Sequence, residues 1–154
     1  MIAENVKVLA TNRKAYHDYH IEETHEAGIV LTGSEIKSVR VGSVNLRDSY
    51  AQVRAGEMWM MNVHIAPYEP ASRQNADPYR DRKLLLHRAE IMRMAGRVQE
   101  KGLTIVPLRM YLKKNRAKVE IGLVRGKKLY DKREAIAKRE SAREIERAVK
   151  ERVR

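Results

Sequence analysis

The chain has 154 residues, with 32 Lys and Arg against 20 Asp and Glu and a formal net charge of +12. It has no cysteine, which excludes a disulfide framework, thiol catalysis and every metal or haem site built on cysteine. No apolar run approaches the roughly 18 to 20 residues that span a bilayer, and no signal-peptide pattern is seen, so we expect a cytoplasmic protein with no membrane association.

Most of the chain before residue 131 has the pattern of short β-strands. Stretches rich in Val, Ile, Thr, Tyr and Leu alternate partially with polar residues and are separated by Gly, Pro or Asn. This pattern is typical of strands and turns. In chain order, the expected strands are 17–31, 44–54, 58–65, 103–112 and 118–124.

A short helix is expected between the first two strands. Ser34 is in a position to cap it. The apolar Ile36 and Val39 would then face inward. Lys37 and Arg40, three positions apart, would share the outer face.

A longer helix is expected near 87–101, where apolar residues recur at i, i+3, i+4 and i+7 and Gly102 ends the pattern. Before it, 67–82 contains three prolines among Ser, Asn, Asp and Arg and is expected to be a long polar loop. The order and size of these elements indicate a mainly β fold: a small antiparallel, oligonucleotide-binding (OB-like) barrel with flanking helices. An open sandwich is the structural alternative.

The end of the chain differs in composition from the rest. Residues 125–154 hold 12 Lys and Arg and 6 Asp and Glu, a net +6, which is half of the total charge. From Asp131 onward there is no Gly or Pro, and the apolar stripe is thin. We therefore expect an RNA-binding barrel over 1–130 and a basic tail over 131–154 that is disordered alone and helical when docked. The alternative is a permanently solvated helix.

Tests for enzymatic motifs give no positive result. His17, His20 and His25 would alternate on an extended strand and so could not converge easily on a metal. The spacing of 28–33 is that of a phosphate-binding loop, but the Lys and Ser or Thr that should follow are missing. We expect no catalytic residue, no metal site and no cofactor.

Basic residues do occur beside aromatic ones in two clusters. RNA-binding surfaces use cations to contact phosphates and flat rings to stack on exposed bases, and surplus positive charge favours nucleic acid as the partner. Whichever of Tyr16 and Tyr19 faces inward is expected to be a core residue instead. The clusters are Asn12, Arg13, Lys14, Tyr16, His17 and Tyr19, and Gly126, Lys127, Lys128, Tyr130, Lys132 and Arg133.

Five segments are recognisable as motifs: 12–19, 26–40, 48–51, 82–87 and 126–133. Together, and in this order, they resemble the SmpB family of bacterial SsrA-binding proteins. The resemblance implies an OB-like barrel whose members bind the tRNA-like domain of transfer-messenger RNA (tmRNA, or SsrA RNA). With elongation factor Tu, they deliver this RNA to stalled ribosomes. The tail enters the empty mRNA channel near the small-subunit decoding region, and the protein makes or breaks no bond.

The resemblance also implies site residues. Glu26, Leu85 and the position of His87, where many relatives have Asn, match places that hold tmRNA in the family. A carboxylate repels phosphate, so Glu26 would accept hydrogen bonds from base or 2′-hydroxyl donors, or would orient a cation. Charge and expected surface position add Arg13, Lys14, His17, Lys37, Arg40 and Lys83.

A second set of residues is expected to contact the ribosome. Tyr130 is where the family places a ring that stacks on a ribosomal RNA base, and Asp131, Lys132 and Arg133 match its tagging determinant. Gly126, Lys127 and Lys128 complete the set.

Three classes of function follow from these observations. The first is the RNA-binding rescue factor, acting as a monomer, which the five motifs favour. The second is a ribosomal or tRNA-chaperone protein with a similar barrel. The third is a ribonuclease that uses His17 and His25.

Overall fold

The computed structural model describes residues 6–68 and 77–126. The expected strands and helices are present, with three additions: a first strand, a short helix after it and a strand before the long helix. The elements are β1 Val6–Thr11, α1 Arg13–Asp18, β2 Tyr19–Ile29, α2 Gly33–Arg40, β3 Val44–Asn45, β4 Tyr50–Arg54, β5 Glu57–Met61, β6 His64–Ile65, β7 Arg82–Leu85, α3 Arg88–Lys101, β8 Thr104–Lys113 and β9 Arg116–Gly126.

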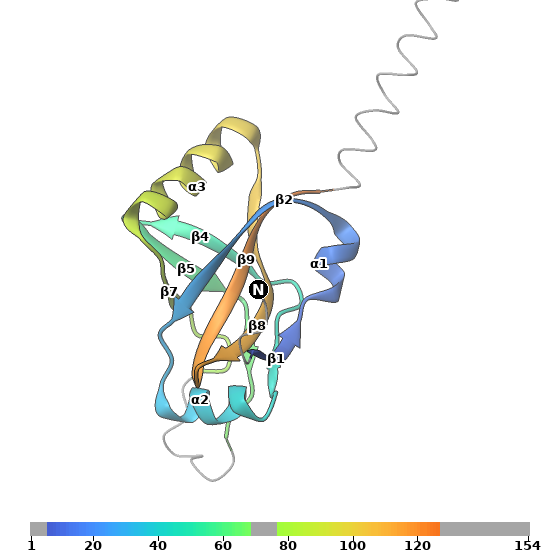
Figure 1. Cartoon of the computed structure of the whole chain (residues 1–154), viewed down its shortest axis with the longest axis vertical. Helices are drawn as coiled ribbons and strands as arrows, with labels where there is room; N and C mark the ends of the chain where they lie inside the picture. The colour runs from blue at the N-terminus through green and yellow to red at the C-terminus, as the bar shows by residue number, and fades with distance from the viewer. Residues whose placement is uncertain (1–5, 69–76, 127–154) are drawn as a thin grey trace, which may run out of the picture.

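The main sheet closes on itself. Its strand order is β1-β8-β4-β5-β7-β2-β9, and a further pairing joins β8 to β9. Every pairing is antiparallel. Six strands therefore form a ring, with β1 added beside β8 (Figure 1). The predicted small antiparallel barrel with flanking helices is confirmed, and the open sandwich is wrong.

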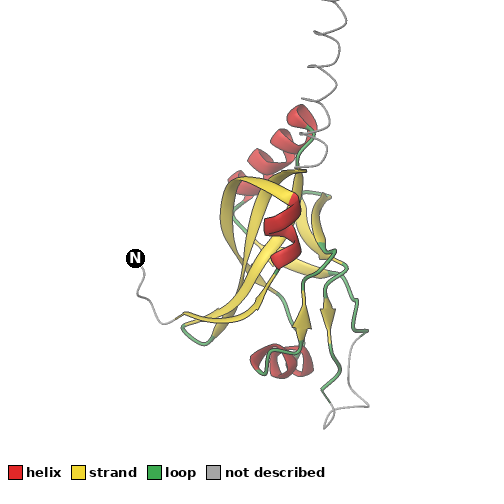
Figure 2. Ribbon diagram, turned by 90° about the vertical axis from the view of Figure 1, so that its right-hand side faces the viewer, coloured by secondary structure: helices red, strands yellow, loops and turns green. Residues whose placement is uncertain are grey.

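Alternation along the strands fills the barrel. On β5, Met58 and Met60 are fully buried, whereas Trp59 between them is partly exposed. Successive strand residues point to opposite faces, so one face of each strand supplies the interior. Val39 of α2 and Met94 of α3 join the same apolar cluster from outside the ring. Figure 2 shows these two helices at opposite ends of the barrel and α1 against its side.

Helix α2 begins two residues earlier than expected, at Gly33. Its cap is Thr32 rather than Ser34: the Glu35 amide donates to the Thr32 hydroxyl at 3.2 Å, and the Thr32 amide donates to the Glu35 carboxylate at 2.9 Å. Val39 is buried as predicted, but Ile36 is 37% exposed, so its inward placement was wrong. The buried face contains Glu35, and Ile36 lies about 100° around the helix from it.

Helix α1 replaces the start of the first expected strand. The side-chain oxygen of Asn12 accepts the Ala15 amide at 3.1 Å, and its nitrogen donates to the carbonyls of Leu46 and Pro107. The buried Asn12 thus caps α1 and fastens it to the barrel. His17 is therefore helical, and strand alternation does not describe its relation to His25. Helix α3 ends as predicted, at Gly102 in a left-handed conformation.

Candidate nucleic-acid interface

A groove lies between α2, the end of β2, β7 and the turn from β8 to β9. Its floor is apolar, and three cationic side chains line it. Leu85 is 51% exposed there, whereas its neighbour Leu84 is buried in the core. We call this surface the β2–β7 groove. Its apolar residues include Ile29, Leu31, Ile36, Leu85 and Leu112, and its cations are Arg40, Arg116 and Lys118.

The pairing of β2 with β7 sets the position of the residues around the groove. Gly28 pairs with Leu85. Because the strands are antiparallel, the residues two positions beyond this pair, Glu26 and His87, follow in the same direction. His87 caps α3, and its amide donates to the Glu90 carboxylate at 3.3 Å. The structure therefore places Leu85 beside the stretch of β2 that follows Glu26, and His87 comes just after the end of β7.

Glu26 carries the negative charge of this surface. Its Oε2 accepts a hydrogen bond from the Tyr111 hydroxyl, and both carboxylate oxygens are 3.5 Å from the Lys113 ammonium. The hydrogen bond from Tyr111 lowers the pKa of Glu26, and the positive charge of Lys113 lowers it further, against the opposing effect of burial. Glu26 is therefore an ionised hydrogen-bond acceptor at neutral pH.

A second carboxylate is placed directly opposite Glu26. Glu26 and Glu120 are partners across β2 and β9, and like charges in that position are destabilising. Arg109 of β8 binds Glu120 through two hydrogen bonds, at 3.0 and 3.3 Å. This bidentate pair neutralises Glu120 and leaves Glu26 to its own partners.

Lys37 and Lys83 lie near the groove. The Lys37 ammonium is 5.7 Å from the centre of the Tyr68 ring, on the exposed side of α2. Lys83 forms an ion pair with Glu57 at 2.7 Å. It lines a second hollow with Leu85 and Met92, so Leu85 is shared by two adjoining depressions.

The groove depends on how α2 is held against β7. The Glu35 side chain is only 4% exposed, and its carboxylate forms two ion pairs. One is with the fully buried guanidinium of Arg82 at 2.6 Å, and the other is with the partly exposed guanidinium of Arg80 at 2.5 Å. Arg82 also donates to the carbonyl of Val63 at 2.6 Å. A buried ion pair with these additional hydrogen bonds fixes the start of α2, and Arg40 lies at the other end of this helix.

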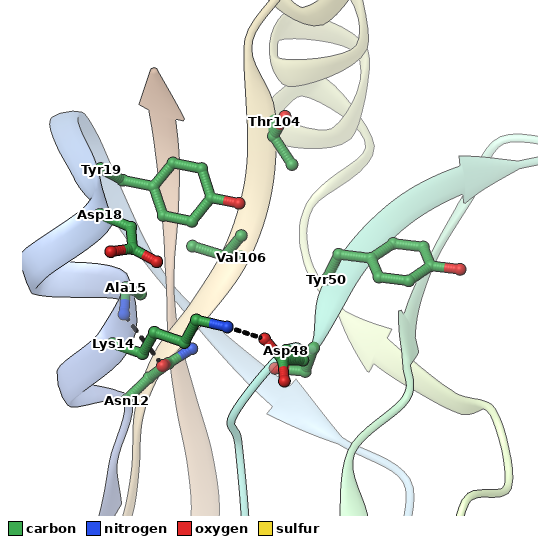
Figure 3. Close-up of a pocket in the computed structure, with 10 residues that line it drawn as sticks. Asn12, Lys14, Ala15, Asp18, Tyr19, Asp48, Tyr50, Thr104 and Val106 are labelled. Atoms are coloured by element: carbon green, nitrogen blue, oxygen red, sulfur yellow. Dashed lines mark hydrogen bonds and ion pairs between the residues drawn. The ribbon is translucent and has the colours of Figure 1, made fainter. Parts of the chain in front are cut away.

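Arg13, Lys14 and His17 are not part of the groove. They lie on α1, on the side of the barrel away from β7 (Figure 1). The Lys14 ammonium is 2.5 Å from the Asp48 carboxylate, beside a hollow lined by Tyr19 and Tyr50 (Figure 3). Of the two tyrosines in the basic segment 12–19, Tyr19 packs on apolar residues beneath α1 and is the inward-facing one. Tyr16 is 40% exposed.

The end of β9 lies beside α1. Gly126 pairs with Tyr19, so the predicted ribosome-binding segment starts next to the basic residues of α1. Lys127, Lys128, Tyr130, Asp131, Lys132 and Arg133 lie outside the described residues, as does all of the predicted tail over 131–154.

The two histidines of the ribonuclease hypothesis have separate surroundings. The His17 side chain is 83% exposed, with its Nδ1 2.8 Å from Asp18. The ring nitrogens of His25 are 2.9 Å from Glu23 and 3.2 Å from Glu90. In residues 6–68 and 77–126 there is no group of three or more side chains that could hold a metal ion. Within the same residues, no helix combines the length and apolar character that crossing a bilayer requires.

Five residues of this surface were not identified from the sequence. Arg116 and Lys118 follow the Asn115 turn on β9, and a basic hairpin tip in a cationic protein is a signal that could have pointed to them. The roles of Tyr111, Lys113 and Arg109 depend on the register of three strands, for which the sequence holds no direct signal.

Comparisons with known proteins identify close relatives. The family model described as SmpB protein matches residues 9–151. The SsrA-binding protein of Carboxydothermus hydrogenoformans is 60% identical over 95% of this chain and 98% of its own length. That of Roseiflexus castenholzii is 64% identical, over 96% and 94% respectively. A solved structure described as "tmRNA-SmpB: a journey to the center of the bacterial ribosome" has 52% identity and a TM-score of 0.67, covering 79% of this chain and 85% of its own.

Proposed function

This chain belongs to the SmpB family, and on that premise we propose that it is an RNA-binding factor of trans-translation. It binds the tRNA-like domain of tmRNA and delivers it, with elongation factor Tu, to stalled ribosomes. Support comes from relatives named SsrA-binding proteins and from a ribosome structure described with tmRNA and SmpB.

The observation that carries this proposal is the β2–β7 groove with Glu26 beside it. An apolar floor can receive an unstacked base, and the cations contact phosphates. Glu26 supplies an acceptor for RNA donors. We assign tmRNA contact to Glu26, Leu85 and His87, with Lys37, Arg40, Lys83, Arg116 and Lys118 around them.

The basic residues of α1 form a second contact. Arg13, Lys14 and His17 are separated from the groove and adjoin Gly126, where the predicted ribosome-binding segment 126–133 begins. A surface at this position is suited to an RNA element different from the one in the groove. The tail over 131–154 would continue from it into the empty mRNA channel.

The chain acts in this account as a cytoplasmic monomer that binds and signals without catalysis. The ribonuclease hypothesis requires His17 and His25 to act on one phosphate. The two imidazoles instead lie on different elements, α1 and β2, and each has its own carboxylate partners. Structured RNA and poly-U should therefore stay intact after incubation with the protein, whereas cleavage that is lost in His17→Ala would support the nuclease.

The experiment that tests the proposed function is a reconstituted translation reaction on an mRNA without a stop codon. Addition of the protein with the tmRNA of its host should append the tag to the stalled chain. The matched control is the same reaction with Glu26→Gln and Arg40→Ala combined, which should tag at a much lower rate at limiting protein. No tag with the unaltered protein would contradict the proposal.

A further inference from the structure

Tyr111 is nearly buried, yet it belongs to neither apolar cluster of the described residues. Its exposure is 4%. Its neighbour Met110 faces the barrel core, so Tyr111 faces the outside of the sheet. There the Arg109 guanidinium lies 5.3 Å from the ring centre, and the hydroxyl donates to Oε2 of Glu26. Tyr111 therefore contacts two charged side chains on the outside of the barrel, Arg109 through its ring and Glu26 through its hydroxyl.

The phenol reaches across a whole strand to make this bond. Tyr111 is on β8 and Glu26 is on β2, with β9 between them. The strand partner of Glu26 is Glu120, a second carboxylate, which is engaged by Arg109. The neutral hydroxyl of Tyr111 on β8 therefore orients the Glu26 carboxylate, whereas Glu120, the cross-strand neighbour of Glu26 on β9, would repel it.

We propose that Tyr111 is a positioning residue for RNA recognition: its hydroxyl holds Oε2 of Glu26 so that Oε1 accepts a hydrogen bond from an RNA donor. The inference rests on the proposed function. The donor is a base N–H or a 2′-hydroxyl, because a carboxylate repels phosphate. Oε1 is 3.5 Å from the Lys113 ammonium, the outer limit of a hydrogen bond, so it keeps acceptor capacity for this contact.

The protonation of both groups agrees with these roles. Burial, together with the hydrogen bond to Glu26, raises the pKa of Tyr111 far above its usual value, so the phenol remains a donor. The same hydrogen bond lowers the pKa of Glu26. The donor and the acceptor therefore keep their roles throughout the neutral range.

A double-mutant cycle tests the proposal. Affinity for the tRNA-like domain is measured for the unaltered chain, Tyr111→Phe, Glu26→Gln and the double variant. We expect about tenfold weaker binding for Glu26→Gln, near the lower end for one lost hydrogen bond to a charged group. For Tyr111→Phe we expect a smaller loss of about fivefold, because the Glu26 carboxylate remains and loses only its orientation. The double variant should bind no more weakly than Glu26→Gln, because Tyr111 acts through Glu26.

The control is Tyr79→Phe, which removes a hydroxyl from a tyrosine that is 55% exposed and lines neither the β2–β7 groove nor the hollow beside α1, and which should leave affinity unchanged. A purely structural role for Tyr111 predicts that the two losses multiply, and that result, or unchanged affinity in Tyr111→Phe, overturns the inference. Failure of the unaltered chain to bind this RNA overturns the proposed function as well.

Two further measurements complete the test. If Tyr111→Phe does not fold, 4-aminophenylalanine at 111 keeps a donor and should keep the affinity; loss of affinity in that folded chain would overturn the inference. Single 2′-deoxy substitutions in the RNA identify the donor. One that weakens the unaltered chain but not Glu26→Gln indicates a 2′-hydroxyl, and absence of any such position indicates a base N–H.

Discussion

Gly28 and Leu85 are cross-strand partners, and a Cβ atom added at Gly28 would lie 3.3 Å from the Cβ of Leu85. That separation is tighter than ordinary van der Waals contact. Gly28 therefore leaves the space in which the half-exposed Leu85 presents its side chain to the groove.

Gly28→Ala should displace Leu85 and weaken binding of the tRNA-like domain. We expect a loss of about fourfold, equivalent to one buried methylene or about 0.8 kcal/mol. The free energy of unfolding should change little, because Leu85 is free to move toward solvent. Fluorescence anisotropy with labelled RNA measures the affinity, and urea unfolding measures the stability.

The control for this change is Gly96→Ala on α3. Apart from the adjacent residues and the backbone of α3 itself, no heavy atom lies within 4 Å of a Cβ built there, and alanine stabilises a helix interior by about 0.5 to 1 kcal/mol relative to glycine. It should raise stability and leave RNA affinity unchanged. Equal affinity losses in both alanine variants would contradict a role for the Gly28–Leu85 contact.

The cations of the groove should determine the salt dependence of binding. Arg40→Ala and Lys118→Ala should each weaken binding and reduce the slope of log affinity against log salt by about 1, as expected for one lost phosphate contact. Lys101→Ala, at the exposed end of α3, is the matched control. A slope that is unchanged in both groove variants would show that neither residue contacts phosphate.

The buried pair of Glu35 and Arg82 should make stability depend on pH. Burial alone would raise the pKa of Glu35, but hydrogen bonds from Arg80, the Thr32 amide and Arg82 lower it overall. A depressed folded-state pKa stabilises the protein above the unfolded-state value, about 4.3, and this contribution is lost as pH falls through the folded-state value. Urea unfolding should therefore show decreasing stability below about pH 4.3.

Glu35→Gln tests the origin of this pH dependence. It should show a weaker fall in stability with acid, and at pH 7 it should be destabilised by about 3 kcal/mol because Arg82 stays buried without its counter-ion. Glu57→Gln, an exposed partner of Lys83, is the control. The same pH profile in Glu35→Gln as in the unaltered chain would mean that other carboxylates carry the effect.

The sequence was most informative where one local rule decided the outcome. Gly102 ends α3 because a left-handed residue closes a helix, and this could be read from the spacing of apolar residues. Met58 and Met60 alternate with partly exposed neighbours, so β5 was also predictable. The barrel followed from many such short segments.

Other features depend on distant residues and were missed. The polar side chain of Asn12 both caps α1 and binds carbonyls far along the chain. The helix was therefore not predicted, and its last two residues were assigned to the first expected strand. Arg82 was predicted to lie at the end of a loop. Arginine is rarely fully buried unless it is paired, and its partner Glu35 is distant in the sequence, so the pairing could not be recognised from local patterns. The contact between Tyr111 and Glu26 requires the register of three strands. Sequence patterns indicate the local periodicity of a strand, but they do not indicate which residues of neighbouring strands are paired.

The charge of the tail leads to a separate prediction. Deleting 131–154 should leave affinity for the tRNA-like domain nearly intact, because the groove lies within residues 6–68 and 77–126. Tagging of stalled chains should be abolished, because the deletion removes the basic segment that is expected to enter the mRNA channel. Binding and tagging are measured on the same preparation, and loss of most RNA affinity on truncation would contradict this division of labour.

The most direct test of the whole account is to identify the RNA that copurifies with the protein from its host. We predict one abundant tmRNA, strongly depleted when Glu26→Gln and Arg40→Ala are combined. A mixture of ribosomal and transfer RNA without enrichment of tmRNA would contradict the account and favour a ribosomal or tRNA-chaperone protein.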